Sequence, residues 1–186
     1  MRPQRRRRSP EALAKIREER KEISDPSVIL EAALRFLEAR QRSTVEVRTR
    51  LNRAGYRPDL VEGAITRLVE LGMLDDESFA KAWVESRDRA HPRGERALQR
   101  ELRMKGIDRE VIVGTLEERE SDRPEAELAA ATRLLARNAS QLGRAADPRA
   151  RRQRAYALLG RNGFDSETAV TAINDWLAEP DEAPEA

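Results

Sequence analysis

The residues in this sequence best suited to chemistry are basic side chains, which recur in three clusters. The clusters are Arg48, Arg50, Arg53 and Arg57; then Arg93, Arg96, Arg100, Arg103 and Lys105; then Arg149, Arg151, Arg152, Arg154 and Arg161. An arginine guanidinium makes bidentate contacts with phosphate or carboxylate groups. The clusters therefore predict binding to a phosphate backbone or to an acidic protein surface. Our candidate contact residues are all of these except Arg149 and Arg161.

Spacing within the clusters supports a shared face. Arg50 and Arg53 are three residues apart and Arg96 and Arg100 four, so each pair lies on one side of a helix. The alternative is an ordinary solvated surface whose charge is neutralised by nearby glutamates. Recurrence of the clusters at equivalent places favours a continuous basic face. Tyr156, within the third cluster, is either a base-stacking residue or part of the core.

Catalytic and metal-binding motifs are absent from the sequence. It has no phosphate-binding loop, nucleophile elbow, cysteine or paired-histidine metal motif, and its single histidine, His91, lies in a Pro-Gly turn. The acidic run Asp75-Asp76-Glu77 suits the start of a helix, where backbone amides favour negative charge, better than a magnesium site. We predict no catalytic residue, no metal and no cofactor.

An internal repeat indicates which elements position the basic clusters. A leucine is followed four residues later by glycine and then by a bulky apolar residue, at Leu51–Gly55–Tyr56, Leu102–Gly106–Ile107 and Leu159–Gly163–Phe164. The copies are 51 and then 57 residues apart. Apolar residues keep the same phase four positions before each leucine and fourteen after it, at Val47, Leu98, Ala155, Ile65, Leu116 and Ile173. Each copy predicts a helix ended by glycine and a second helix packed against it.

Together with the repeat, further helix signals predict an all-α fold. We expect three tandem three-helix modules that form an elongated molecule, preceded by a basic N-terminal extension. Ser9-Pro10 predicts one helix start, Ser43 to Glu46 a capping box, and Pro58 another start. A long connection runs from Asn138 to Pro148. We expect an Arg-rich extension at residues 1–26 that is partly disordered, and in which residues 11–23 form a helix only on a partner. The three modules are expected at residues 27–72, 73–121 and 122–178. A disordered acidic tail is expected at residues 179–186.

Composition fits a protein with thin cores and much exposed charge. Of 186 residues, 38% are charged and 4% aromatic, and the net charge is only +2. Residues 1–26 carry nine basic and five acidic side chains, whereas the segments after residue 72 are slightly acidic. No stretch has the length and apolarity of a membrane span. We expect a cytoplasmic monomer without membrane contact.

The sequence between Ala33 and Glu118 resembles the RecX recombination regulators of bacteria. The residues that carry the resemblance are Ala33-Leu34-Arg35-Phe36-Leu37, Arg40-Gln41-Arg42-Ser43, Leu51, Gly55-Tyr56, Leu74-Asp75-Asp76, Phe79-Ala80, Gly94 and Glu101-Leu102-Arg103-Met104-Lys105-Gly106-Ile107. The third repeat copy extends the resemblance over roughly residues 28–177. Ala155, where the other copies have Val or Leu, and the long connection depart from the family pattern.

The resemblance implies a modular, non-enzymatic helical protein that binds the RecA recombinase and its nucleoprotein filament. It implies inhibition of the ATPase, strand-exchange and coprotease activities of RecA. Contact with single- or double-stranded DNA through the basic face is a further expectation. The alternative is a direct DNA-binding regulator built of helix-turn-helix-like modules, although residues 108–118 and 166–177, the last helices of their modules, are acidic. A structural adaptor for another filament is a third hypothesis.

Overall fold

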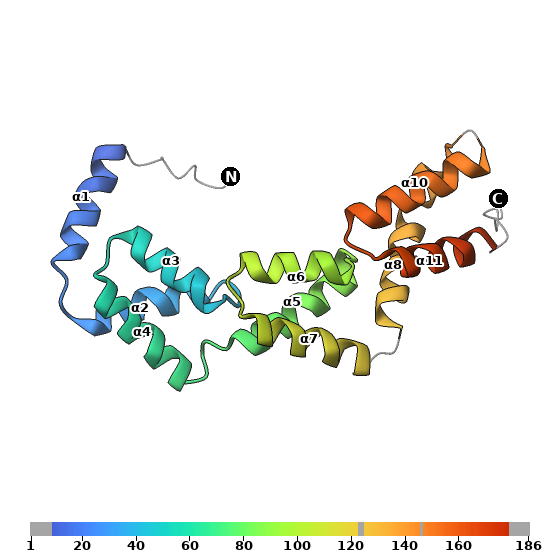
Figure 1. Cartoon of the computed structure of the whole chain (residues 1–186). Coiled ribbons are helices and arrows are strands. Elements are labelled where there is room, and N and C mark those ends of the chain that lie inside the picture. The colour runs from blue at the N-terminus through green and yellow to red at the C-terminus, as the bar shows by residue number, and fades with distance from the viewer. Residues whose placement is uncertain (1–8, 123–124, 146, 179–186) are drawn as a thin grey trace. The chain divides into compact units, whose positions relative to one another are not determined.

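The computed structural model describes residues 9–122, 125–145 and 147–178, which form eleven helices and no strand (Figure 1). The helices are α1 (Pro10–Lys21), α2 (Pro26–Leu37), α3 (Thr44–Ala54), α4 (Pro58–Glu70), α5 (Asp76–Ala90), α6 (Glu95–Met104), α7 (Arg109–Asp122), α8 (Ala126–Arg137), α9 (Ala139–Gly143), α10 (Pro148–Arg161) and α11 (Ser166–Ala178). The predicted all-helical fold class is therefore confirmed.

Local sequence signals set most helix ends. Ser9 caps α1 through the N–H of Ala12, and Ser43 and Glu46 form the predicted capping box of α3. Gly55 ends α3 with a φ of 98°, a left-handed conformation that glycine adopts without steric cost. Pro58 begins α4 as expected. Capping therefore explains why the chain divides into short helices at these places.

The acidic residues at the start of α5 serve two helices. The Asp75 carboxylate accepts hydrogen bonds from the N–H groups of Glu77 and Ser78, at 2.9 and 3.1 Å. The Asp76 carboxylate accepts one from the N–H of Thr44, at 2.8 Å, and so caps α3. Free N–H groups at helix starts explain this acidic pair.

The chain divides into two compact units, residues 1–79 and 80–186, and the division falls within α5. In the first unit α2 and α3 pack on α4, around a core that contains Val47, Leu51 and Ile65. The Arg20 guanidinium of α1 lies 5.1 Å from the centroid of the Tyr56 ring and donates to the Ala54 carbonyl at 3.0 Å. The segment expected to order only on a partner is thus a helix docked on the end of α3.

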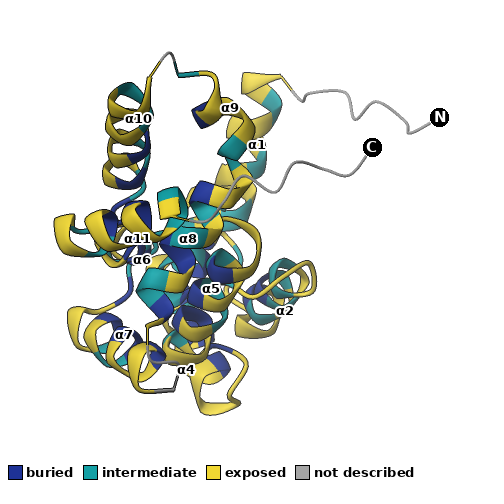
Figure 2. Ribbon diagram, turned by 90° about the vertical axis from the view of Figure 1, so that its right-hand side faces the viewer, coloured by how far each residue is buried: buried dark blue, intermediate teal, exposed yellow. Residues whose placement is uncertain are grey.

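In the second unit α8, α10 and α11 enclose a core that contains Leu135, Ala155, Leu159 and Ile173. Buried residues occupy one side of α10 and exposed residues the other (Figure 2). α7 packs on both α6 and α8. The apolar positions that the repeat predicts to be inward-facing are buried, except that Tyr56 is half-buried.

One expectation differs from the structure. The connection from Asn138 to Pro148 is not wholly irregular, because residues 139–143 form the short helix α9 and bury Leu142. The expected disorder at residues 1–8 and 179–186 falls outside the described residues, and the module boundaries remain a prediction.

Candidate interaction surface

Helix α6 presents a row of unpaired arginines. Ala97, Leu98 and Leu102 are buried, so the 3.6-residue period turns Arg96, Arg100 and Arg103 to solvent. These three guanidiniums make no hydrogen bond or ion pair with any residue that the structure describes. Their charges are therefore available to a partner.

A surface pocket of about 620 Å³ lies beside this row. Its lining comprises Arg93, Ala97, Arg100, Glu101, Arg103, Met104 and Arg161. Four arginines from two distant parts of the sequence thus meet around one hollow. The fourth, Arg161, is exposed and is the last residue of α10.

Arg93 is held at the pocket wall by two partners. It donates a hydrogen bond to the side-chain oxygen of Asn162, and its Nε lies 3.3 Å from Oε1 of Glu101. Asn162 in turn accepts a hydrogen bond from the N–H of Gly94 through its carbonyl, at 3.0 Å. The pocket wall is therefore preorganised by contacts between α10 and the segment that leads into α6.

A second hollow, of about 230 Å³, continues the basic surface along α10. Arg154 and Arg161 both line it, and they lie seven residues apart on the same side of the helix. Because Arg161 lines both hollows, it joins the arginines of α6 to those of α10. We call the set Arg93, Arg100, Arg103, Arg154 and Arg161 the arginine strip.

The other candidates in α10 lie elsewhere. Arg152 donates a hydrogen bond to the side chain of Asn174 in α11, at 2.7 Å. Arg151 is half-buried, and its Nε is buried with no hydrogen-bond partner among the described residues. Neither residue lines the two hollows.

Most basic candidates of the first unit are engaged by their neighbours. Arg48 forms a bidentate ion pair with Glu62, at 2.7 and 3.0 Å, and Arg57 forms one with Asp59. These pairs hold the pKa of the Glu62 and Asp59 carboxyls below their usual values, chiefly through the arginine hydrogen bonds. Arg50 lies 5.7 Å from the centroid of a phenylalanine ring, whereas Arg53 is exposed and unpaired among the described residues.

The half-buried Trp83 side chain contacts two basic side chains and a glutamate. Arg87 and Lys105 lie over its ring, at 4.4 and 4.8 Å from the centroid, and its indole N–H donates to Glu101 at 2.9 Å. Arg87 Nε also donates to Glu101, at 2.6 Å. Lys105, a candidate contact, is thus partly committed to an internal cation–π interaction.

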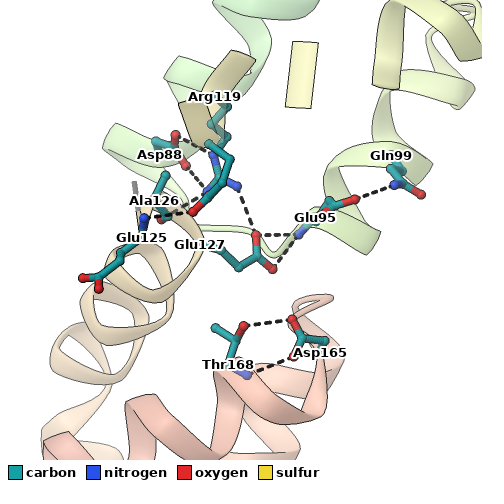
Figure 3. Close-up of polar contacts among 10 residues, drawn as sticks. Asp88, Glu95, Gln99, Arg119, Glu125, Ala126, Glu127, Asp165 and Thr168 are labelled. Carbon is teal, nitrogen blue, oxygen red and sulfur yellow. Dashed lines mark hydrogen bonds and ion pairs between the residues drawn. The ribbon is translucent and has the colours of Figure 1, made fainter. Parts of the chain in front are cut away.

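A buried ion network links α5, α7 and α8 to the start of α6, the helix that carries Arg100 and Arg103 (Figure 3). The Arg119 side chain of α7 is 4% exposed and makes two hydrogen bonds to Asp88, at 3.0 and 3.1 Å. It also donates to Glu127 of α8, at 3.0 Å. Both Glu127 oxygens accept from the N–H of Glu95, at 2.9 and 3.0 Å, so this carboxylate caps α6.

The pKa values in this network reflect burial and pairing together. Burial raises the pKa of Glu127, against the lowering effect of its hydrogen bonds from Glu95 and Arg119. For Arg119, burial acts to lower the pKa, but the partnership with Asp88 and Glu127 outweighs it and raises the value. The guanidinium stays charged and ties α5, α7 and α8 together.

Close backbone contact at two glycines reinforces this arrangement. A Cβ at Gly94 would clash with the backbone of Gly163, and a Cβ at Gly163 would clash with Ala97. Gly163 also has a φ of 90°, which favours glycine. The repeat predicts Gly163 as a helix end, but its contact with α6 depends on packing between distant segments.

Two residues of the candidate surface and of the ion network that supports it were not among the candidates from sequence, although each left a signal there. Arg161 follows Arg154 by two helical turns on the same side of α10. Arg119 continues the buried stripe of Ile112 and Leu116, a phase that predicts a buried and paired arginine. Within the described ranges no group of acidic and histidine side chains could hold a metal, and no helix could cross a membrane.

Comparison with known proteins decides the family. The family models described as "RecX, first three-helix domain" and "RecX, second three-helix domain" match residues 30–68 and 75–116. The regulatory protein RecX of Mycobacterium sp. (strain JLS) is 37% identical over 147 residues, which is 78% of this chain and 79% of that protein. The chain belongs to the RecX family.

Other RecX relatives agree with this assignment. The protein of Mycolicibacterium vanbaalenii is 46% identical over 83 residues, but this match spans only 45% of either chain. The crystal structure of RecX from Lactobacillus salivarius superposes with a TM-score of 0.70 at 21% identity, over 81% of this chain and 95% of that one. This structural likeness supports the fold.

Proposed function

We propose that this RecX-family chain binds the RecA recombinase and its nucleoprotein filament, and inhibits the ATPase, strand-exchange and coprotease activities of RecA. The observation that supports the proposal most directly is the arginine strip, three of whose members, on α6 and at the end of α10, are exposed and unpaired among the described residues. Relatives named as regulatory proteins support a regulatory role for this chain. It would act in the cytoplasm, in DNA repair and the SOS response.

Several weak contacts suit a long partner better than one deep site does. The exposed arginines are spread over α3, α6 and α10, and each exposed ion pair contributes only about 0.2–1 kcal/mol. Contacts linked within one chain combine to give high avidity on a repeating filament. This arrangement also predicts strong salt dependence if DNA phosphates are touched directly.

The test is the single-stranded-DNA-dependent ATP hydrolysis of RecA while the purified chain is titrated in. We expect inhibition at well below one chain per RecA. The double variant Arg96→Glu/Arg100→Glu should weaken inhibition, because both side chains are exposed and neither makes a hydrogen bond or ion pair with a described residue. The matched control is Arg109→Glu/Arg133→Glu, which reverses two exposed arginines outside the candidate set.

Direct binding to free DNA is the second candidate. The same unpaired guanidiniums of α6 suit phosphate oxygens, which is the observation in its favour. Tight binding of free duplex DNA at physiological salt, without inhibition of RecA by the folded chain, would replace the first proposal with this one.

A further inference from the structure

The pocket beside α6 combines positive charge with an exposed apolar side chain. We propose that it binds an acidic polypeptide segment in which a large apolar residue lies next to carboxylates. The inference deepens the proposed function, on which it rests, by stating the chemistry of the partner segment. The residues that carry it are Arg93, Arg100, Arg103, Arg161, Met104 and Ala97.

Positive charge around the pocket exceeds the negative charge that could neutralise it. Arg100, Arg103 and Arg161 have no hydrogen-bond or ion-pair partner among the described residues. Glu101, the one carboxylate among the described residues of the lining, is already shared between Arg87 and Arg93, at 2.6 and 3.3 Å. The planar fork of a guanidinium pairs with a carboxylate through two parallel hydrogen bonds. The pocket can therefore accept more than one carboxylate.

Met104 supplies the apolar part of the site. It is 79% exposed at the last position of α6, and it lines the same pocket as the unpaired arginines. Methionine is flexible and polarizable, so it adapts to a partner side chain of irregular shape. Covering it with a leucine or phenylalanine would remove apolar surface of both partners from water. A phosphate backbone has no group that gains from this contact.

Two observations favour a polypeptide over nucleic acid. Among the described residues no aromatic side chain lines the pocket, whereas single-stranded nucleic acid is held by stacking of bases on aromatic rings. The nearby Trp83 ring has Arg87 and Lys105 over it. The arginines also converge on one hollow of about 620 Å³, a volume suited to side chains.

Fluorescence anisotropy with labelled synthetic peptides tests the proposal on the full chain. The probe is an Asp/Glu-rich peptide with one central leucine. Two comparison probes are used, the same peptide with serine in place of leucine and an oligothymidylate of equal charge. We expect the leucine peptide to bind most tightly at physiological ionic strength. Arg100→Glu/Arg161→Glu should weaken it by about tenfold or more, and Arg109→Glu/Arg133→Glu should leave it unchanged.

The Met104→Ala variant separates the apolar contact from charge. The variant should bind the leucine peptide several-fold more weakly than wild type does and should bind the serine peptide as tightly as wild type does. Circular dichroism tests whether each variant is folded. If Arg100→Glu/Arg161→Glu is not folded, the charge-neutral variant Arg100→Gln/Arg161→Gln is used in its place. Tighter binding of the oligothymidylate through the same arginines would overturn the proposal in favour of a phosphate site. Equal binding of both peptides, or no binding of either, would also overturn it.

Inhibition of RecA ATP hydrolysis, measured with the same proteins, keeps this inference apart from the proposed function. If the wild-type chain inhibits RecA but binds no acidic peptide, the pocket inference fails and the function stands. If the chain binds the peptide through this pocket but does not inhibit RecA, the function fails and the pocket chemistry stands.

Discussion

Helices α3 and α6 carry the same repeat but use their arginines differently. Each buries a leucine before a left-handed glycine, at Leu51 and at Leu102. Arg48, on α3, is neutralised by the glutamate Glu62 of α4, whereas Arg96, Arg100 and Arg103 of α6 are unpaired among the described residues. The repeat thus determines which positions face solvent, and the acids on adjacent helices determine which charges remain available to a partner.

The two helices also differ in how their first turns are capped. Helix α3 is capped by Ser43, directly before it, and by Asp76, within the same unit. Helix α6 begins after a glycine and is capped by Glu127 of α8, a carboxylate held by Arg119. The free arginines of α6 therefore lie on a helix whose position depends on a buried ion network. Four predictions test this contrast.

The largest effect is expected for Arg119→Met. This change removes the guanidinium that makes two hydrogen bonds to the buried Asp88, and breaking a buried ion pair costs about 3–5 kcal/mol. The control Arg48→Met breaks an exposed pair and should cost under about 1 kcal/mol. Urea denaturation of both variants measures the free energy of unfolding. Equal losses would show that the ion network adds nothing beyond an ordinary surface pair.

A smaller loss, about 2–4 kcal/mol, is expected for Gly163→Ala. About 1 kcal/mol arises from the positive φ, and the rest from the clash of the new Cβ with Ala97 in α6. Gly72→Ala is the matched control, because Gly72 has a φ of 67° and open space around its Cβ position. Thermal unfolding compares the two, and a difference near zero would mean that α6 does not press on Gly163.

The sequence predicts the helices and their inward faces well, because caps and apolar phase are local. Ser43, Gly55 and Pro58 each act through neighbours a few residues away, so their roles follow from spacing alone. The leucines of the repeat are buried for the same reason. Helix α9 escapes prediction because five residues give too short a pattern to distinguish from a loop.

The candidate site is less predictable, because it depends on which segments meet. Arg161 joins Arg100 only because the end of α10 meets the start of α6, where the Asn162 carbonyl accepts a hydrogen bond from the N–H of Gly94. The Glu127 carboxylate caps α6 from 32 residues away, which no local motif indicates. Similarly, the spacing of Arg48 and Glu62 does not by itself reveal that the two side chains meet across adjacent helices.

Replacing arginine by glutamine removes the positive charge without reversing it, and so tests the contrast between the paired arginines of the α3 region and the unpaired arginines of α6. Arg96→Gln/Arg100→Gln removes two unpaired charges, and should weaken inhibition of RecA by about tenfold, equivalent to about 1.4 kcal/mol. Arg48→Gln/Arg57→Gln removes two charges already paired with acids and should change it by less than about threefold. ATP hydrolysis by RecA at fixed salt is the measurement. A stronger effect of the α3 pair would place the main contact on the first unit.

The smallest effect concerns the start of α11 and its dependence on pH. Asp165 accepts hydrogen bonds from the N–H and hydroxyl of Thr168, at 2.9 and 2.8 Å, and the backbone hydrogen bond is the chief reason that its pKa is lowered (Figure 3). A carboxyl whose pKa is lower in the folded state stabilises the fold above its unfolded pKa, and this contribution is lost as pH falls through the folded value. Asp165→Asn keeps an oxygen acceptor but lacks the charge, so it should cost about 0.5 kcal/mol at neutral pH. Urea denaturation of wild type and variant should give free energies of unfolding that converge as the pH is lowered through the folded pKa of Asp165, since protonated aspartate resembles asparagine. A difference that stays constant as the pH is lowered would mean that the charge of Asp165 has no part in capping α11.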